Sequence, residues 1–283
     1  EIHERLVGSE MCIRDRKIAV IMSLYKNDKV EYVRMAVESI LNQSFRDFEF
    51  YIQYDGPVRE EVDRFLSSLK DDRIVVYRRA ENKGLAQSLN DLLAIIMPKG
   101  YEYIARMDAD DIAEENRFER QLEYLRAHPD LECVGTWAIE ITSTGEEYFR
   151  KQMPETHEEC LRLFRKRDCM IHPTVMFQRS YLEKAGMYAL DTFFGEDTMM
   201  WAQGFVVGCR MGNVPEYLFR FRLDDHFFDR RRGWKYAKGI WRLRHRVNKM
   251  LGFGVVEDGW AIAYAVAKMM PQSVLNMIYK TVR

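Results

Sequence analysis

The sequence predicts an α/β protein built on a mostly parallel central sheet flanked by helices, and two observations lead to that fold class. Strand-like apolar runs and amphipathic helical segments alternate four times before residue 112. This alternation is typical of βαβ units, which have parallel strands and right-handed crossovers. The chain of 283 residues, 47% of them hydrophobic, is also long enough for one large domain with a smaller addition.

Each of the four predicted strands is a short, mainly apolar run. They are KIAVIMSL (17–24), FEFYIQYDG (48–56), RIVVYRR (73–79) and YEYIARM (101–107). Between them, apolar residues recur every three or four positions, as on one face of a helix. Further along, the sequence predicts a helix through Phe118 and Leu125, a strand LECVGTWAI, and a hairpin around Thr144-Gly145.

The two ends of the chain differ from this pattern. Residues 1–16 are polar and aperiodic, and we interpret them as a disordered leader or a cloning or sequencing scar. Residues 17–226 form the predicted α/β domain, and residues 227–283 a basic amphipathic helical extension. No apolar run reaches the roughly 20 residues that span a bilayer. The nearest candidate, WAIAYAVAKMMP, is interrupted by Lys268 and Pro271.

Charge and cysteine content limit the classes of partner and compartment. The formal net charge is −1 and no RNA-module motif is present, so we expect no nucleic-acid partner. The five scattered cysteines favour a reducing cytoplasm over a disulfide framework. Residues 220–249 carry eleven Lys and Arg against three Asp, with tryptophans between them. This composition fits either a solvated helix face or peripheral attachment to an anionic membrane, here the inner face of the plasma membrane.

The segment YIARMDADD (103–111) places three carboxylates within four positions at the end of a predicted strand. Like charges this close repel unless a cation or a set of donors neutralises them. Alternate residues of an extended segment point the same way, so Asp108 and Asp110 can face one ligand. Their oxygens suit Mg²⁺ or Mn²⁺. The structural alternative is an acidic turn in which Asp111 caps the helix at 114–127.

Polar residues follow three of the predicted strands. Ser23 to Tyr25 follow the first, Asp55 the second, and residues 108–111 the fourth. Ligands of open α/β sheets bind outside the carboxyl ends of the strands, so we expect these groups to border one crevice. No GxGxxG follows the first strand and no GxxxxGK[ST] occurs in the chain, which disfavours a Rossmann dinucleotide site and a P-loop.

Six ordered motifs resemble those of family 2 glycosyltransferases with the GT-A fold, particularly bacterial enzymes of capsule, exopolysaccharide and amylovoran-type synthesis. They are VIMSLYKND, AVESILNQSFRDFEF, YDGP, NKGLAQSLN, DADD and GEDTMMW. The resemblance covers roughly residues 17–226. It implies a Rossmann-like GT-A sheet and a hexosyltransferase-type activity that depends on Mn²⁺ or Mg²⁺. The implied reaction is inverting transfer from a nucleotide-sugar, a UDP-sugar by expectation, to a saccharide or lipid-linked saccharide.

The resemblance also implies roles for the nucleotide side of the site. Ser23 and Tyr25 would lie beside the base, and Asp55 would accept a hydrogen bond from it. Asn82 and Lys83 would border the nucleotide and its diphosphate.

On the reacting side, the resemblance implies that Asp108 contacts ribose or metal and that Asp110 ligates the metal. Asp197 would be the general base on the acceptor hydroxyl, and Glu196 would help to place the acceptor. The chain departs from the family at Tyr54, where many members carry a second acidic residue.

Four further residues are candidates for ligand contacts. His172 and Trp201, and less strongly Trp137, could contact acceptor sugars, with a buried structural role as the alternative for each. His226 lies where related enzymes can place a metal or phosphate contact.

Two other functions compete with glycosyl transfer. A sugar-nucleotide pyrophosphorylase would share the nucleotide fold, but its glycine-rich loop after the first strand is missing. A non-catalytic peripheral membrane assembly protein would not need Asp108, Asp110 and Asp197 intact.

Overall fold

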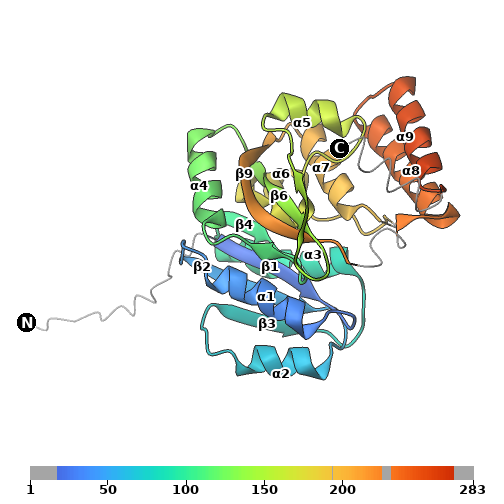
Figure 1. Ribbon diagram of the computed structural model, residues 1–283. Coiled ribbons are helices and arrows are strands. Elements are labelled where there is room, and N and C mark those ends of the chain that lie inside the picture. Colours follow the sequence, from blue (N-terminus) through green and yellow to red (C-terminus); the bar gives the residue numbers. More distant parts are fainter. Residues whose placement is uncertain (1–17, 193, 225–230, 271–283) are drawn as a thin grey trace, which may run out of the picture.

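The computed structural model describes residues 18–192, 194–224 and 231–270, and this part of the chain forms one nine-stranded sheet covered by helices (Figure 1). The strands are β1 (Ile18–Leu24), β2 (Phe48–Tyr54), β3 (Ile74–Arg78), β4 (Tyr103–Arg106), β5 (Ile112–Ala113), β6 (Cys133–Ile141), β7 (Glu147–Lys151), β8 (Met176–Gln178) and β9 (Met211–Arg222). The helices are α1 (Val30–Leu41), α2 (Glu60–Ser68), α3 (Leu85–Ile96), α4 (Arg117–Ala127), α5 (His157–Phe164), α6 (Arg179–Ala185), α7 (Glu196–Val206), α8 (Trp234–Met250) and α9 (Val255–Ala267). Two 3₁₀ turns, η1 (Met97–Lys99) and η2 (His172–Thr174), complete them.

The strand order is β3-β2-β1-β4-β8-β6-β9-β5, with β7 paired to β6. The first four strands are parallel, as the βαβ pattern predicts. β8 runs antiparallel to both β4 and β6, and β9 is parallel to β6. The predicted fold class is therefore confirmed, with its parallel character concentrated in the β3-β2-β1-β4 half.

Alternate residues of the central strand β1 face two hydrophobic cores. Val20 and Met22 pack with α1, α2 and α4, whereas Ala19 and Ile21 pack with α3 and the helices that follow β8. A strand buried on both faces has no polar side, which explains why KIAVIMSL is a continuous apolar run.

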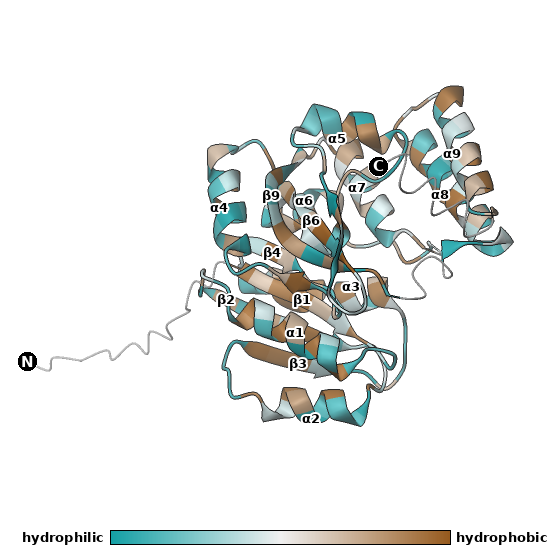
Figure 2. Ribbon diagram, viewed as in Figure 1, coloured by the Kyte–Doolittle hydropathy of each residue, from teal (hydrophilic) through white to brown (hydrophobic). Residues whose placement is uncertain are grey.

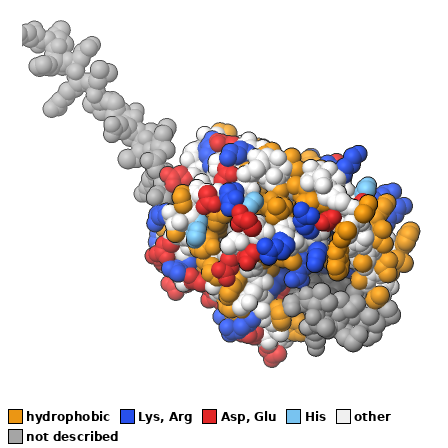
Figure 3. All heavy atoms as spheres, turned by 90° about the horizontal axis from the view of Figure 1, so that it is seen from above, with side chains coloured by type: hydrophobic (Ala, Val, Ile, Leu, Met, Phe, Trp, Pro, Cys, Tyr) orange, Lys and Arg blue, Asp and Glu red, His pale blue; other side chains and the backbone are white. Residues whose placement is uncertain are grey.

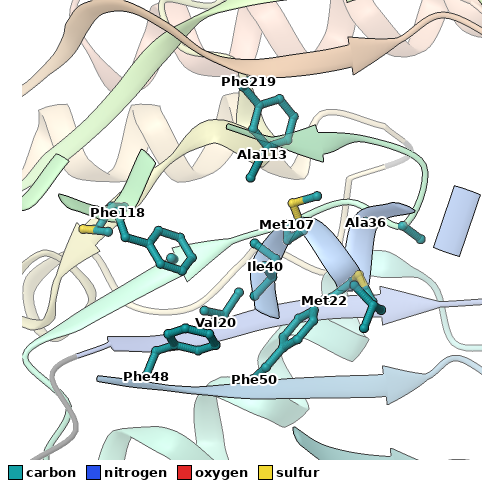
Figure 4. Close-up of a cluster of buried hydrophobic side chains, with 14 of the residues drawn as sticks. Val20, Met22, Ala36, Ile40, Phe48, Phe50, Met107, Ala113, Phe118 and Phe219 are labelled. Carbon is teal, nitrogen blue, oxygen red and sulfur yellow. The ribbon is translucent and has the colours of Figure 1, made fainter. Parts of the chain in front are cut away.

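Figure 4 shows the first of these cores, in which aromatic side chains of neighbouring elements meet. Phe48 of β2 contacts Phe118 of α4 edge-to-face, with ring centroids 5.7 Å apart. Phe219 of β9 closes the same cluster from the other half of the sheet. This core therefore holds α4 and β9 against the parallel strands whose ends carry the polar residues.

Two local expectations have different outcomes. The hairpin around Thr144-Gly145 is confirmed, since β6 and β7 pair antiparallel and Gly145 takes a left-handed φ of +91°. The alternative role of Asp111 as a helix cap is wrong. Helix α4 begins after Asn116, and Asp111 bonds to β9 instead.

The ends of the chain are described only in part. Residues 1–16 and the boundary at residue 226 lie outside the described residues, so the division into a leader, an α/β domain and an extension stays a prediction. Within the described part, α8 and α9 follow the sheet as a helical addition (Figure 1). None of the described helices is long and apolar enough to cross a membrane.

The aromatic contact between α4 and β2 gives a stability prediction. Phe118 is fully buried, so Phe118→Ala should lower the free energy of unfolding by about 3–5 kcal/mol through lost burial and a residual cavity. Denaturant titration measures this change. Leu190, with 58% of its surface exposed, provides the control: Leu190→Ala should change stability by less than about 0.5 kcal/mol. Equal losses in the two variants would contradict the assignment of this core.

Candidate functional site

The ends of β1, β2 and β4 bring most of the predicted site residues to one edge of the sheet. Leu24 pairs with Tyr54, so β1 and β2 end level, and Arg106 pairs with Ile21, so β4 ends three residues earlier along β1. Ser23 and Tyr25 are half-buried there, and Asp55 follows β2 directly. The acidic segment 108–111 follows β4. The expected convergence of strand ends on one edge is thus present.

Four carboxylates interact at this edge. Asp28 accepts a hydrogen bond from the Tyr25 backbone N–H at 2.8 Å, yet burial, and then the charges of Asp110 and Asp108, raise its pKa to about 8. Burial and Asp108 likewise raise the pKa of Asp110 to about 6, with a further contribution from Asp224. Negative charge is therefore concentrated at this edge, and the surrounding hydrogen-bond donors do not fully offset it.

Arg106 forms an ion pair with this group. It is the last residue of β4 and fully buried, and its Nη2 lies 2.6 Å from Asp108 Oδ1. Burial alone would lower the pKa of a guanidinium, but Asp108, Tyr188 and Glu196 outweigh burial and raise it. Arg106 thus interacts both with the acidic segment and with the residue that begins α7.

Asp55 is held by the turn between β3 and α3. Its Oδ1 accepts a hydrogen bond from the Lys83 backbone N–H at 2.7 Å and pairs with Arg79, and its Oδ2 accepts from the Gly84 N–H at 3.0 Å. Asn82 Nδ2 donates to the Asp55 carbonyl oxygen at 3.1 Å. The carboxylate is 4% exposed, so it fixes this turn while leaving Asn82 and Lys83 exposed at the edge.

Asp111 and Arg222 fasten the acidic segment to β9. Asp111 Oδ1 accepts a hydrogen bond from the Arg222 backbone N–H at 2.7 Å, and Arg222 Nε donates to the Asp110 carbonyl oxygen at 2.8 Å. Burial, together with Asp110 and Asp108, raises the pKa of Asp111 well above its usual range. Asp111 is therefore a buried structural group, and these two hydrogen bonds hold the acidic segment against β9.

Asp197 lies in the first turn of α7. Burial, and then Asp168 and Glu196, raise its pKa to about 7, while the Thr198 N–H donates to its Oδ1 at 2.7 Å. Asp168 is itself occupied by Arg244 and the Thr198 hydroxyl, each at 2.8 Å. A carboxyl group with a pKa near neutrality is suited to accept a proton at physiological pH.

The predicted acceptor contacts of His172 and Trp201 need correction. Trp201 has no exposed surface and stacks on Phe177 with ring centroids 5.9 Å apart, so the expectation that it contacts an acceptor sugar is wrong. His172 is 8% exposed, and its Nε2 is 2.9 Å from the Tyr188 hydroxyl oxygen. Burial and Arg106 lower its pKa well below the usual range. His172 is thus a neutral, internally bonded ring behind Arg106.

Trp137 is half-buried on β6. Its indole N–H donates to the Met153 carbonyl oxygen at 2.9 Å, and its ring packs on Tyr217. It borders an open cavity of about 350 Å³ between β6 and α5, which no residue of the segment 108–111 lines. His226 lies outside the described residues.

The sequence resemblance implies a divalent cation at the strand-end carboxylates. Among the described residues, no three His, Cys, Asp or Glu side chains form a ready metal cluster. Mg²⁺ needs only one or two carboxylates, since waters and substrate phosphates complete its shell. Burial, and then the neighbouring carboxylates, raise the pKa values of Asp28 and Asp110, and a divalent cation would offset this crowding of negative charge. Asp108 and Asp110 therefore fit such a cation in chemistry and charge.

Three residues of this edge escaped the sequence analysis. The sequence does contain a signal for Arg106, because an arginine inside an apolar strand needs a buried partner. Asp28 and Arg79 gave weaker signals, since a polar residue after a strand usually belongs to a solvated turn. Only the packing of α1 and α3 brings these two side chains to the strand ends.

Comparison with known proteins identifies relatives over most of the chain. The family model described as "Glycosyl transferase family 2" matches residues 19–186. The amylovoran biosynthesis glycosyltransferase AmsE of Erwinia amylovora is 28% identical over 269 residues, covering 93% of this chain and 97% of that protein. The UDP-Gal:alpha-D-GlcNAc-diphosphoundecaprenol beta-1,3-galactosyltransferase of Escherichia coli is 27% identical over 223 residues, covering 78% of this chain and 79% of that protein.

Solved structures share the fold. S. aureus TarS 1–349 in complex with UDP-GlcNAc aligns with a TM-score of 0.64 at 12% identity, over 94% of this chain and 76% of that one. The mannosyltransferase PcManGT from Pyrobaculum calidifontis, in complex with GDP-Man and Mn²⁺, aligns at 0.62 and 13%, over 94% and 79%. The family and the fold expected from the sequence motifs are confirmed.

The electrostatics of Asp28 give a prediction about pH. Its pKa of about 8 lies above the ordinary value, so stability present at low pH is lost as the pH rises from about 4 through 8. Asp28→Asn keeps an acceptor for the Tyr25 N–H and should raise stability at pH 8 by about 1–3 kcal/mol. Thermal unfolding between pH 4 and 9 in chelator measures this change. The exposed Asp47→Asn should follow the wild type, and an unchanged pH slope in Asp28→Asn would contradict the cluster.

Proposed function

Because the chain belongs to glycosyl transferase family 2 and is a glycosyltransferase, we propose that it transfers a hexose from a UDP-sugar to a saccharide hydroxyl in surface polysaccharide synthesis. Two relatives support this substrate class: one is named for amylovoran biosynthesis and the other for a UDP-Gal donor and a lipid-linked diphosphate acceptor. The neighbouring TarS structure contains UDP-GlcNAc, which supports the same donor class. The acceptor is a saccharide, either free or lipid-linked.

The observation that carries the proposal is the group of carboxylates with raised pKa values at the ends of β1 and β4. In the proposed site, Asp108 and Asp110 hold Mn²⁺ or Mg²⁺, and Asp108 also faces the ribose. The Mn²⁺ in the neighbouring PcManGT structure supports this assignment. Such a cation, when bound, neutralises the charge that grows on the departing diphosphate. Arg106, whose Nη2 lies 2.6 Å from Asp108 Oδ1, orients that carboxylate.

The nucleotide would bind along the turns that end β1, β2 and β3. Ser23 and Tyr25 border the base, and Asn82 and Lys83 border the diphosphate. For Asp55 we propose a contact with the base. It would use the hydrogen-bond acceptor capacity that its carboxylate oxygens have beyond their bonds to Arg79 and the two backbone N–H groups. Its main contribution is then to fix the turn that carries Asn82 and Lys83.

Asp197 is the proposed general base. A single displacement with inversion needs a group that removes the proton of the attacking hydroxyl as the bond to the sugar forms. The pKa of about 7 leaves a large share of Asp197 ionised at neutral pH while keeping it a competent base. Glu196 would orient the acceptor, with His172 and Tyr188 supporting Arg106 from behind. We place the reaction in the cytoplasm, which the buried, free Cys133, Cys160, Cys169 and Cys209 support.

Replacing the proposed metal ligand gives a test of the donor site. Asp110→Asn should abolish turnover and weaken Mn²⁺-dependent UDP binding at least tenfold, since a hydrogen-bonding amide replaces an anionic oxygen ligand. Calorimetry with UDP, in the presence and absence of Mn²⁺, measures the affinity. Asp47→Asn is the matched control away from the strand ends. Unchanged Mn²⁺-dependent UDP affinity in Asp110→Asn would remove the metal assignment.

Replacing the proposed base separates binding from chemistry. Asp197→Asn should leave UDP affinity near that of wild type and lower kcat by a factor on the order of 10²–10⁴. In the wild type, kcat should rise with pH until the base is ionised, near pH 7. The residual activity of the variant should lack this rise. A variant with near wild-type kcat and the same pH profile would mean that another group is the base.

A further inference from the structure

Helices α8 and α9 form an antiparallel hairpin at the edge of the molecule (Figure 1). At one end the Gly233 N–H donates to the Lys268 carbonyl oxygen at 2.9 Å. At the other end Asn248 Nδ2 donates to Asp258 Oδ1 at 2.8 Å. The hairpin is therefore a folded unit with two defined outer surfaces.

The inner side of α8 belongs to the core around α7. Leu243 and Val247 are buried in the cluster that includes Trp201 and Met199 of α7. Arg244 is also buried and pairs with Asp168 at 2.8 Å. This side of α8 explains the apolar residues of the helix without any external partner.

Helix α9 has the opposite distribution of side-chain size. Its buried residues are Ala261 and Ala265, which let it approach α8 closely. Its large apolar side chains point outward, with Val255 87%, Ile262 52% and Val266 50% exposed. A surface helix of a globular protein normally buries its large apolar residues and exposes polar ones. Figure 2 shows hydrophobic residues along much of α9 at the edge of the molecule.

The exposed large apolar residues are concentrated in one part of the chain. More than half of the large hydrophobic side chains exposed in the described part of the chain come from residues 234–270, and they are Trp234, Trp241, Met250, Val255, Val256, Trp260, Ile262, Tyr264, Val266, Met269 and Met270. Single exposed apolar residues are ordinary, but many on one pair of helices indicate an interaction surface. We call these eleven residues the hairpin face.

Positive charge accompanies the hairpin face. Residues 231–270 contain nine Lys and Arg against two acidic residues, a formal charge of +7 in a chain whose net charge is −1. Both acidic residues have local partners: Glu257 pairs with Arg165 at 2.8 Å, and Asp258 accepts a hydrogen bond from Asn248 Nδ2 at 2.8 Å. Figure 3 shows hydrophobic and basic side chains side by side at this end of the molecule.

Three cations of α8 are not used within the fold. Lys238, Arg242 and Lys249 are exposed, and none of them has an ion pair or hydrogen bond with another described residue. Their spacing of four and seven residues places them along one stripe of the helix. The arginines of β9 that the sequence grouped with this stretch behave differently, since Arg222 is buried against the acidic segment and Arg220 pairs with Glu114.

We propose that the hairpin face binds the surface of an anionic lipid bilayer. Valine, isoleucine and methionine would enter the boundary of the acyl chains, the three tryptophans would lie at headgroup level, and the lysines and arginines would face lipid phosphates. Charge alone would also suit a polyanion such as RNA, but an exposed aliphatic helix contributes nothing to phosphate recognition. This inference goes beyond glycosyl transfer and does not depend on the donor or the acceptor.

The location of the surface has a consequence for the site. Helix α8 packs on α7, the helix that begins with Glu196 and Asp197. A bilayer bound by the hairpin would therefore lie on the same side of the molecule as α7, beyond α8 and α9. An acceptor anchored in that bilayer would be concentrated near this side of the site.

Vesicle sedimentation with the full chain tests the proposal. The wild type should sediment with phosphatidylcholine vesicles containing phosphatidylglycerol, much less with phosphatidylcholine alone, and less as salt rises. Val255→Ser, Ile262→Ser and Val266→Ser combined should abolish binding. Lys238→Gln, Arg242→Gln and Lys249→Gln combined should weaken it on the order of a hundredfold, since each cation near an anionic surface contributes about fivefold.

Matched controls use exposed residues elsewhere. Val206→Ser with Val207→Ser, and Lys70→Gln with Arg126→Gln, should bind vesicles as the wild type does. Thermal unfolding verifies that every variant is folded, and UDP calorimetry reports the donor site separately from lipid binding.

Several results would overturn the proposal. They are equal recovery on anionic and neutral vesicles, unchanged binding by the triple serine variant, and RNA binding that displaces the protein from vesicles and persists in that variant. Light scattering that shows a dimer, converted to monomer by the serine substitutions without any vesicle binding, would assign the face to a second copy instead.

Discussion

Arg106 is a cation without access to water, and the two sides of the site are arranged around it. Transfer of an isolated guanidinium into a protein interior costs many kcal/mol, so the fold must supply negative charge close by. It does so with Asp108, whose Oδ1 lies 2.6 Å from the Nη2 atom, and Glu196 at the start of α7 makes a smaller contribution. Loss of Asp108 would leave the buried guanidinium without its ion-pair partner. The end of β4 is therefore bound to the acidic segment by this buried ion pair.

The aspartates of the acidic segment lie in different surroundings, although they are close in the sequence. Asp108 and Asp110 are half-buried at the edge, whereas Asp111 is turned inward and bonded to β9. Burial, and then Asp110 and Asp108, raise the pKa of Asp111, and its Oδ1 accepts a hydrogen bond from the Arg222 backbone N–H. Asp111 thus has a structural role, although not the helix cap considered from the sequence, whereas ligand binding by Asp108 and Asp110 stays a proposal.

Much of the fold could be predicted because its signals are local. The run KIAVIMSL is apolar on both faces and forms a strand from Ile18 to Leu24, and the strand-end positions of Asp55 and Asp108 follow from that pattern. Trp201 could not be placed in this way. Residues 198–202 are buried in an unbroken run, so α7 has no polar face that would reveal which side meets solvent. The perturbed pKa values of Asp28 and Asp197 arise from burial by distant segments, and no local pattern encodes them.

The packing of α8 at Gly195 has an evolutionary consequence. Gly195, directly before α7, has a φ of +85°, and a side chain added there would overlap Leu243 of α8. The inner residues of α8 must consequently change in step with the start of α7, and they should diverge slowly among descendants of this gene. The large apolar residues Val255, Ile262 and Val266 of α9 are at least half exposed, so the packing of the described residues constrains them less. The sequence of this hairpin should therefore diverge slowly at the residues that pack on α7 and faster at the residues that face away from it.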